Sequence, residues 1–523
     1  MSTPEEEEPL QVPGRRGLLV AMLILAVLAG VAAGAGIATL GSSDDETSSG
    51  SEEIAADAEP LAPAGDGAAQ DQPDTTVPWT GPPNVLVVMT DDQTVEQMRW
   101  LPSVQRFMTS GTEYVNSITN YPLCGPSRAT FLLGQYANTH GMRCNRGLAA
   151  QFNRVEADSL APWVQAQGVH TIHVGKYLNG YGGEERTRYI PAGWDDWRTL
   201  AGSSAFNYLR FDMVINGEFV RYGRQGETAY QTDVLADQLD DALRVAPTDR
   251  PFFAVFTPLA PHFQIGENRD FAIPAPRHED TIDDVLRPPN YDACEVRDAP
   301  CAPEGSDLRP GPLDEARKAI VDNAYQTTSE SLLAVDEAFQ RIVDTLAELG
   351  RLEHTVVIFT SDNGFMFGEH GIPQGKKVPT RESLFVPLLI AGPGFEAGQE
   401  TAPVTNADLA PTIVDIFDAQ PTLALDGQSL LEELSPDRAL LIEAKPQAGT
   451  RGYTGTFADG WLYIDWEELD RNELYAPDDV LQLQNLDDDP AFDAIESELG
   501  QLTAELLACR GEACRIDWTA PGS

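Results

Sequence analysis

Basic residues are scarce in this chain: 35 lysines and arginines stand against 82 aspartates and glutamates in 523 residues, a formal net charge of −47. A chain this acidic is repelled by phosphate backbones, which argues against nonspecific nucleic-acid binding. The charge favours solubility, and an anionic substrate would need a local basic pocket to overcome the global field. The sequence also contains no internal repeat, Walker loop or dinucleotide-binding glycine fingerprint, and so carries no sign of those architectures.

Long apolar runs are also rare, and the one at residues 17–40, "GLLVAMLILAVLAGVAAGAGIATL", carries no charge. A helix of roughly 20 residues crosses a hydrocarbon core of about 30 Å, so this segment is long enough for a membrane anchor. Arg15 and Arg16 precede it and place residues 1–16 in the cytoplasm and the rest outside. A cleaved signal sequence ending near the small residues 33–35 is the alternative. Both interpretations export the protein, as a single-pass membrane protein or a secreted one.

Large apolar residues are nearly absent between residues 41 and 83, where Ser, Asp, Glu, Ala, Pro and Gly predominate. Such a segment cannot bury enough surface to offset its ordering entropy, so we predict a disordered acidic linker. The folded part is predicted to begin at Asn84, and with 42% hydrophobic residues the chain has enough apolar surface for a core. We predict a catalytic domain over 84–435 and a smaller subdomain over 436–518.

Two short apolar runs, "NVLVVMTDDQ" from Asn84 and "HTVVIFTSDNG" from His354, each end in acidic or amide residues. Runs of this length, bounded by polar residues, are typical of strands buried on both faces. Ligand sites of open α/β sheets lie beyond the carboxyl ends of the strands. The sequence therefore predicts oxygen ligands for Ca²⁺ or Mg²⁺ at one sheet edge. They are Asp91, Asp92, Asp362 and Asn363. Taken alone, each pair is more typical of a turn or helix cap.

The segment "CGPSRATFLLGQY" from Cys124 to Tyr136 decides between these alternatives. It resembles the C-x-P-S-R signature of the type I sulfatases, which belong to the alkaline phosphatase superfamily. The segments "VGKYLNGYG", "TPLAPH", "FTSDNG", "GKK" and "VPLLIAGPG" follow in the order of that family. The resemblance covers about residues 84–515 and is closest to N-acetylglucosamine-6-sulfatase-like and arylsulfatase-like members. It implies a large, mostly parallel α/β sheet flanked by helices and a smaller α+β C-terminal subdomain.

The resemblance also implies the chemistry. In the family the cysteine, here Cys124, is oxidised to Cα-formylglycine (3-oxoalanine) by the formylglycine-generating enzyme, and a hydroxyl of the aldehyde hydrate attacks sulfur. A cation, Ca²⁺ by resemblance with Mg²⁺ as the alternative, activates that hydroxyl. Its ligands come from position 124 and the four strand-end residues. The second hydroxyl then drives release of sulfate, which explains why a thiol is encoded but no thiol reacts.

Four cationic or proton-donating residues complete the expected site. Arg128 lies one helical turn after Cys124 and is expected to hold the aldehyde hydrate. Lys176 and Lys376 match the family's sulfate-binding lysines, with Lys377 a competitor for the second. His262 matches the histidine that binds sulfate and protonates the leaving alcohol.

The chain departs from the commonest pattern at Leu178, where many sulfatases have a histidine. The pattern "GKYLN" instead resembles glucosamine-6-sulfatases and heparan endosulfatases, with Asn179 as a polar candidate. The base for the second hydroxyl is therefore open. A second departure is Thr380 and Arg381, which replace an aromatic–acidic pair and change the expected substrate contacts.

Cysteine is sparse as well, with six residues in the chain. Conversion of Cys124 leaves five, and in an exported protein Cys294–Cys301 and Cys509–Cys514 are close enough for short-loop disulfides. Cys144 is then unpaired. The alternative is a third disulfide from Cys124 to Cys144.

The expected function is hydrolysis of sulfate esters, of sulfated sugars or aryl sulfates, outside a membrane. The expected partners are a sulfated small molecule or glycan, the formylglycine-generating enzyme and the membrane. Three alternatives remain: a phosphonate or phosphate ester hydrolase of the same superfamily, an inactive cell-surface binding protein, and a structural surface protein on an acidic stalk. We also expect a helix beginning near Asn406, with this residue as its cap, and Gly350 as the C-cap of a long helix after Asp314.

Overall fold

The computed structural model describes residues 81–183, 188–224, 229–265, 271–282, 290–291, 313–446, 451–467 and 471–521. These residues belong to one compact unit. The predicted anchor at 17–40 and almost all of the predicted linker lie outside the described residues and stay predictions. Within the described part, none of the helices combines the length and the apolar character that a membrane crossing requires.

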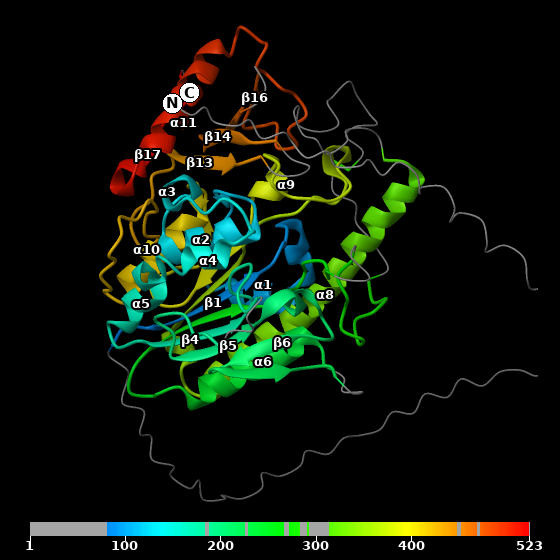
Figure 1. Cartoon of the computed structure of the whole chain (residues 1–523). Coiled ribbons are helices and arrows are strands. Elements are labelled where there is room, and N and C mark those ends of the chain that lie inside the picture. The colour runs from blue at the N-terminus through cyan, green and yellow to red at the C-terminus, as the bar shows by residue number, and fades with distance from the viewer. Residues whose placement is uncertain are drawn as a thin grey trace, which may run out of the picture. The chain divides into compact units, whose positions relative to one another are not determined.

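A ten-stranded sheet forms the centre of the unit, in the order β11-β2-β10-β9-β1-β8-β4-β5-β6-β7 (Figure 1). Its five middle strands run parallel, namely β9 (Thr355–Ser361), β1 (Asn84–Thr90), β8 (Phe252–Thr257), β4 (His170–Gly175) and β5 (Asp196–Leu200). Antiparallel pairing begins at β10 (Leu388–Ala391) on one side and at β6 (Asp212–Ile215) and β7 (Glu218–Arg221) on the other. The edge beyond β10 is completed by β2 (Thr112–Tyr114) and β11 (Gly398–Glu400). The predicted α/β class with a mostly parallel sheet is confirmed.

Helices cover both faces of this sheet. One face packs against α1 (Pro102–Met108), α6 (Gln231–Val245) and α8 (Glu315–Glu348). The other packs against α2 (Cys124–Leu133), α4 (Leu148–Phe152), α5 (Leu160–Gln165) and α10 (Leu409–Ile416). Helix α8 ends at Glu348 with Leu349 as its C-cap, so the predicted C-cap is one residue too late. Gly350 follows the cap and adopts a left-handed φ of 64° that glycine tolerates best.

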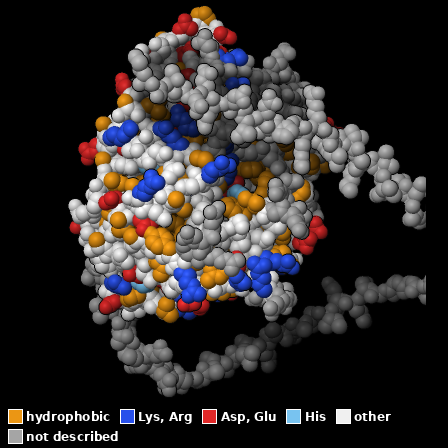
Figure 2. Space-filling model, in the orientation of Figure 1, with side chains coloured by type: hydrophobic (Ala, Val, Ile, Leu, Met, Phe, Trp, Pro, Cys, Tyr) orange, Lys and Arg blue, Asp and Glu red, His pale blue; other side chains and the backbone are white. Residues whose placement is uncertain are grey.

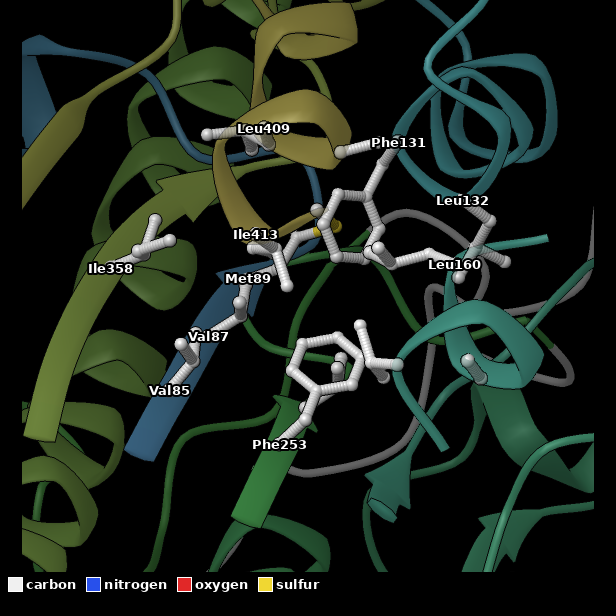
Figure 3. Packing of buried hydrophobic residues seen from close by; sticks show 14 of the residues in the cluster. Val85, Val87, Met89, Phe131, Leu132, Leu160, Phe253, Ile358, Leu409 and Ile413 are labelled. Atoms are coloured by element: carbon white, nitrogen blue, oxygen red, sulfur yellow. The ribbon is translucent and has the colours of Figure 1, made fainter. Parts of the chain in front are cut away.

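The alternation of β1 explains why this run of apolar residues is buried throughout. Val85, Val87 and Met89 point to one face, where they pack with Phe131 and Ile413 (Figure 3). Leu86 and Val88 point to the other face and join the second core. Each such side chain contributes about 1.5–3 kcal/mol when fully buried. The strand is thereby held in a register that fixes the position of the residues following it.

Shorter elements connect these layers. They are β3 (Ser117–Ile118), which pairs with β12 (Val404–Thr405), the helices α3 (Ala137–His140) and α9 (Arg381–Leu384), and the 3₁₀ turns η1 (Glu96–Trp100), η2 (Glu156–Asp158), η3 (Gly202–Phe206), η4 (Leu352–His354), η5 (Glu369–Gly371) and η6 (Asn406–Asp408). The prediction that Asn406 caps the helix is wrong. Thr405 occupies the cap and forms a capping box with Asp408. Asn406 is buried and its side chain bonds to another segment.

A second, five-stranded antiparallel sheet follows, in the order β16-β15-β14-β13-β17. Its strands are β13 (Arg438–Ala444), β14 (Tyr453–Ala458), β15 (Trp461–Trp466), β16 (Asn472–Tyr475) and β17 (Ile516–Asp517). Helix α11 (Asp493–Ala508) packs against it, and η7 (Gly511–Cys514) follows. This is the smaller C-terminal subdomain that the sequence predicts, although its boundary at residue 436 stays a prediction.

The cysteines follow most of the expected pattern. Cys509 and Cys514 form a disulfide. Cys124 and Cys144 are both free thiols, so the alternative disulfide between them is wrong. The predicted Cys294–Cys301 pair lies outside the described residues.

A buried carboxylate in the second sheet predicts a pH-dependent stability. Glu473 accepts hydrogen bonds from Trp466 Nε1 and Tyr475 Oη, yet burial raises its pKa to about 7. A raised pKa in the folded state gives stability that is present below the unfolded value and is lost as the pH rises through about 7. Glu473→Gln avoids the buried charge, and the hydroxyl of Tyr475 can turn to accept from the new amide.

As the pH rises from 4.5 to 8, we expect the free energy of unfolding of Glu473→Gln to increase relative to that of the wild type, by up to about 3 kcal/mol. Urea titrations at several pH values measure this difference. Glu505→Gln, at an exposed position of α11, is the matched control. A difference between Glu473→Gln and the wild type that does not change with pH would contradict the interpretation.

Candidate active site

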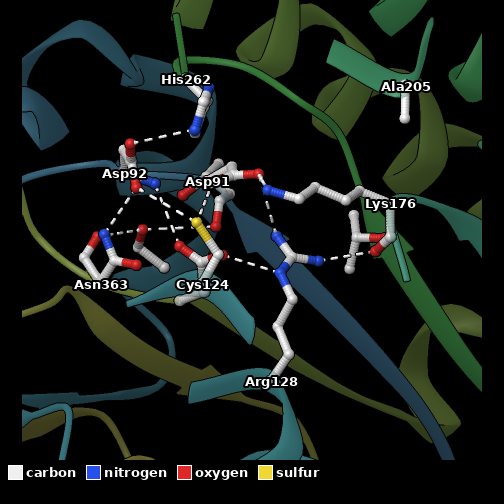
Figure 4. Close-up of polar contacts among 12 residues, drawn as sticks. Asp91, Asp92, Cys124, Arg128, Lys176, Ala205, His262 and Asn363 are labelled. Carbon is white, nitrogen blue, oxygen red and sulfur yellow. Dashed lines mark hydrogen bonds and ion pairs between the residues drawn. The ribbon is translucent and has the colours of Figure 1, made fainter. Parts of the chain in front are cut away.

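The order of the parallel strands brings together residues that are far apart in the chain. Because β9, β1, β8 and β4 are neighbours, their carboxyl ends meet at one edge of the sheet. Asp91 and Asp92 follow β1, and Asp362 and Asn363 follow β9, with the backbone N–H of Asp92 donating to Asp362 Oδ1 over 3.2 Å. Figure 4 shows the side chains of Asp91, Asp92 and Asn363 pointing toward a common centre.

Cys124 occupies that centre at the first turn of α2, with only 1% of its surface exposed. Its Sγ lies 3.4 Å from Asp91 Oδ1 and 3.9 Å from Asp92 Oδ1 (Figure 4). Asp92 adopts a left-handed φ of 70°, which costs a non-glycine residue about 1–3 kcal/mol and is found most often at functional sites. The turn after β1 is therefore strained in a way that aims this carboxylate at Cys124.

Arg128 lies one helical turn after Cys124 and is buried rather than on the surface. Its Nε donates to Asp362 Oδ2 over 2.8 Å, and one terminal nitrogen donates to the Lys176 carbonyl over 2.7 Å. The other terminal nitrogen lies 3.5 Å from Asp91 Oδ2 and has no hydrogen-bond partner. The guanidinium thus joins the ends of three strands and retains a donor for a further ligand.

The two predicted lysines and the histidine also reach this centre. Lys176, after β4, forms an ion pair with Asp91. Lys376, in the loop after η5, pairs with Asp92, and its Nζ lies 2.8 Å from Cys124 Sγ. The Nε2 atom of His262 lies 3.7 Å from Asp92 Oδ2. The structure therefore brings together all nine predicted site residues, Asp91, Asp92, Cys124, Arg128, Lys176, His262, Asp362, Asn363 and Lys376.

The electrostatics of the site are those of buried opposite charges. Burial raises the pKa of Asp362 to about 6, helped by the charge of Asp91 and opposed by that of Arg128. Burial alone would raise the pKa of Asp91 as well, but Lys176 and then His262 and Arg128 hold it well below its usual range. The Cys124 thiol has a pKa raised to about 12, first by burial and then by Asp91, and is protonated at neutral pH.

The oxygen atoms at this edge fit a hard divalent cation. Potential ligand atoms of Asp91, Asp92, Cys124 and His262 lie within 4.8 Å of one another. Asn363 Oδ1 is buried and has no hydrogen-bond partner, although the same amide donates to Asp92 Oδ1 over 2.6 Å. A buried acceptor without a donor is unfavourable unless a ligand satisfies it, and carboxylate and amide oxygens are what Ca²⁺ prefers.

Sequence reasoning missed the residues that hold α2 in place. Ser127 Oγ donates to the Asp362 carbonyl, and the Asn406 amide donates to Ser127 Oγ over 2.9 Å and to its carbonyl over 3.1 Å. Asn145 Oδ1 accepts from the Gly125 N–H over 2.9 Å. No local pattern identifies such contacts, because the partners are far apart in the chain.

Replacing Asn406 tests this support. Asn406→Ala leaves Ser127 and the Asn120 N–H without their buried partner, so we expect unfolding to become easier by about 1–3 kcal/mol. We also expect turnover of any substrate to fall, because α2 carries Cys124. Guanidinium titration measures the first effect, and Asn153→Ala, at an exposed residue beyond α4, is the control. A variant as stable as the wild type would show that the contact contributes nothing.

The carboxyl edge of this α/β sheet thus gathers a buried cysteine, carboxylates and cations in one site. The Sulfatase family model matches residues 83–419. The chain belongs to the sulfatase family, and the resemblance predicted from "CGPSR" is confirmed.

Similar proteins extend this result. The chain is 30% identical to human N-acetylglucosamine-6-sulfatase over 67% of its length, and 28% identical to an arylsulfatase of Volvox carteri over 83%. It is 30% identical to the Drosophila melanogaster extracellular sulfatase SULF-1 homolog over 68%. The matches span 64% of the human protein and 32% of the fly protein, so the chain covers less than two thirds of either.

Solved structures show the same fold. A protein solved with its substrate D-glucosamine-2-N,6-O-disulfate superposes with a TM-score of 0.66 and 21% identity, over 82% of this chain and 98% of that chain. A phosphonate monoester hydrolase of Agrobacterium radiobacter superposes with a TM-score of 0.60 and 19% identity, over 82% and 95%. The shared fold therefore extends to both sulfatases and phosphonate hydrolases.

Proposed function

We propose that this protein hydrolyses sulfate esters, with Cys124 as the precursor of the nucleophile. The observation that carries the proposal is the convergence of three cationic side chains, a histidine and a set of carboxylates on one buried cysteine. Three positive groups, Arg128, Lys176 and Lys376, balance the charge of a bound sulfate group. The site lies in a chain of net charge −47, so this concentration of positive charge is local.

The protein surface agrees with such a substrate. On the face drawn in Figure 2, separate lysine and arginine side chains lie among uncharged surface, whereas most acidic side chains lie toward the edges. Basic side chains with few acidic neighbours attract an anion locally, despite the acidity of the whole chain. This attraction meets the condition that the composition places on an anionic substrate.

Each residue has a separate role in the proposed reaction. Lys176 and Lys376 bind the sulfate oxygens and neutralise the charge that develops on them. His262 gives a proton to the leaving alcohol. Arg128 orients the group at position 124, to which its free donor is close.

The proposed site needs two further components, an oxidised group at position 124 and a bound cation. Cys124, once oxidised to Cα-formylglycine by the formylglycine-generating enzyme, offers an aldehyde hydrate whose hydroxyl is the nucleophile. A cation, Ca²⁺ or Mg²⁺, held by Asp91, Asp92, Asp362, Asn363 and position 124, supplies a Lewis acid that lowers the pKa of such a hydroxyl. The carboxylates also hold Lys176 and Lys376 in place until sulfate binds.

Sulfated sugars are the proposed substrates, with aryl sulfates as the alternative. The support is the similarity to a protein named N-acetylglucosamine-6-sulfatase and to extracellular sulfatases. We propose that the reaction takes place outside the cytoplasmic membrane, with the catalytic domain anchored by residues 17–40 or secreted after their removal.

A comparison of ester classes tests the proposal. The protein is produced together with a formylglycine-generating enzyme and assayed with 4-nitrophenyl sulfate, N-acetylglucosamine 6-sulfate and a phenylphosphonate monoester. We expect kcat/KM to be highest for a sulfate ester. A higher value for the phosphonate would favour the phosphonate hydrolase alternative, and no turnover of any ester would favour an inactive binding protein.

Removal of the cation is expected to affect both activity and stability. Without it, the carboxylates of Asp91, Asp92 and Asp362 lack part of their balancing charge. We expect activity to fall at least about 100-fold and the thermal midpoint to drop, because a ligand at 100 times its Kd stabilises by about 2.7 kcal/mol.

Dialysis against a chelator, followed by calorimetry with and without added Ca²⁺ or Mg²⁺, measures both effects. Asp362→Asn is the matched variant, and its midpoint should respond less to added cation. Protein that is shown by elemental analysis to be free of metal, yet keeps its activity and midpoint, would contradict the prediction.

A further inference from the structure

Phe206 contacts two of the groups that the proposed reaction uses, although no sequence motif points to it. It is the last residue of η3, and its ring centroid lies 4.7 Å from Lys176 Nζ. The same ring lies 5.3 Å from the His262 ring, at an interplanar angle of 51°. Figure 4 shows the preceding residue, Ala205, on the Lys176 side of the site. One aromatic ring therefore touches both the lysine and the histidine.

Hydrogen bonds on each side of Phe206 in the chain hold the segment that carries this ring. The Phe206 carbonyl accepts from the Ile265 N–H over 3.0 Å, three residues after His262. At the start of η3, the Gly202 N–H donates to the Tyr181 carbonyl over 3.0 Å, on the segment that follows Lys176. Two residues further on, Tyr208 Oη donates to the His262 carbonyl over 2.8 Å. Segment 202–208 thus bridges the strand ends that carry the lysine and the histidine.

We propose that Phe206 is a positioning residue that orients Lys176 toward sulfate and His262 toward the leaving alcohol. The ammonium of Lys176 gains a cation–π contact on the ring. When sulfate replaces part of the ion pair with Asp91, this contact keeps Nζ from turning away into water. The ring also limits the orientations of the His262 imidazole, whose Nδ1 lies 2.7 Å from the Phe263 carbonyl. The inference rests on the proposed function.

A simple packing role makes a different prediction. Phe206 is only half-buried, and leucine provides much of the same apolar surface. If packing were its whole contribution, Phe206→Leu would leave the reaction almost unchanged. If the ring orients the two groups, Phe206→Leu lowers activity, whereas a substitution by another aromatic residue preserves it.

The dependence on the leaving group separates the two effects. 4-Nitrophenolate departs without a proton, so 4-nitrophenyl sulfate depends on Lys176 but little on His262. We expect Phe206→Leu to lower its kcat/KM about 3-fold, because one cation–π contact is lost. An alkyl leaving group, as in N-acetylglucosamine 6-sulfate, also needs the proton, so we expect a loss of at least about 30-fold. Phe206→Tyr should restore both values to within about 2-fold of the wild type.

Binding of inorganic sulfate gives a readout that does not depend on turnover. We expect calorimetric titration to show sulfate binding about 3-fold weaker in Phe206→Leu and unchanged in Phe206→Tyr. Phe107→Leu is the matched control, because Phe107 is also half-buried but packs edge-on against Phe339 at 5.6 Å, and not against Lys176 or His262. Its kinetics and sulfate affinity should equal those of the wild type.

Three results would overturn the inference: equal losses for both substrates, unchanged sulfate affinity in Phe206→Leu, or a Phe206→Tyr variant as impaired as Phe206→Leu. Failure of the proposed function has a different signature. Wild-type protein that hydrolyses no sulfate ester would refute the proposed function, whereas ring-dependent sulfate binding by that protein would still support the contact with Lys176.

Discussion

Cys124→Ala is expected to abolish sulfate ester hydrolysis while the protein still folds. Loss of a nucleophile lowers kcat by at least about 1,000-fold in enzymes where it has been removed. The substitution removes only a sulfur atom from a buried position at the start of α2, and that atom contacts Asp91 and Lys376 through polar groups alone. The hydrogen bonds of Arg128 and Ser127 that hold the helix are unaffected.

Mass spectrometry of the peptide that contains position 124 tests whether the active protein carries formylglycine there. Formylglycine lowers the residue mass relative to cysteine, and the extent of conversion should match the extent of activity. Cys144→Ala is the control, because Cys144 is also a free thiol and should keep full activity when replaced. Fully active protein with an unmodified thiol at position 124 would refute the proposed mechanism, as would near-normal turnover by Cys124→Ala.

Arg128→Leu is expected to have the largest effect on stability. The guanidinium is buried between Asp362 and Asp91, and its removal leaves two buried carboxylates without this partner. Breaking a buried ion pair by removing one member typically costs about 3–5 kcal/mol. Turnover should be lost as well, because the same side chain lies within reach of position 124.

Denaturant unfolding at neutral pH measures the loss of stability. Arg128→Lys keeps the charge but loses the forked donor geometry, so we expect an intermediate value. Arg99→Leu is the control, because Arg99 pairs with Glu96 on the surface, where such pairs contribute at most about 1 kcal/mol. If Arg128→Leu lowered the free energy of unfolding no more than the control does, the cation and the two lysines would suffice to balance the charge of the carboxylates.

The sequence predicted the strands and their terminal residues because both signals are local. The apolar run before Asp91 and the run before Asp362 are each complete within about ten residues, and burial on both faces explains their composition. The position of Arg128 relative to Cys124 follows from helix geometry alone. The cap of the helix after Thr405 was wrongly placed because Thr405 and Asn406 are both favourable cap residues, and the tertiary role of Asn406 decides between them.

Other parts of the site had no local signal. Phe206 lies in an irregular turn, and the partners of its ring are 30 and 56 residues away in the chain. Asn406 and Asn145 support α2 from different segments. A phenylalanine or asparagine in such a segment fits many structural roles, so residue type alone does not identify the one it has.

The sequence by itself determined which chemical groups this protein has and the order in which they occur: oxygen ligands at the ends of two strands, a cysteine and an arginine one helical turn apart, and two lysines and a histidine further on. The tertiary structure decided that these groups meet. The order β9-β1-β8-β4 places four strand ends side by side, and packing of α2 against the sheet places Cys124 among them. Neighbouring residues in the sequence specify local conformation. Whether the site residues meet depends on which strands pair and which faces are buried, and both depend on contacts between distant residues.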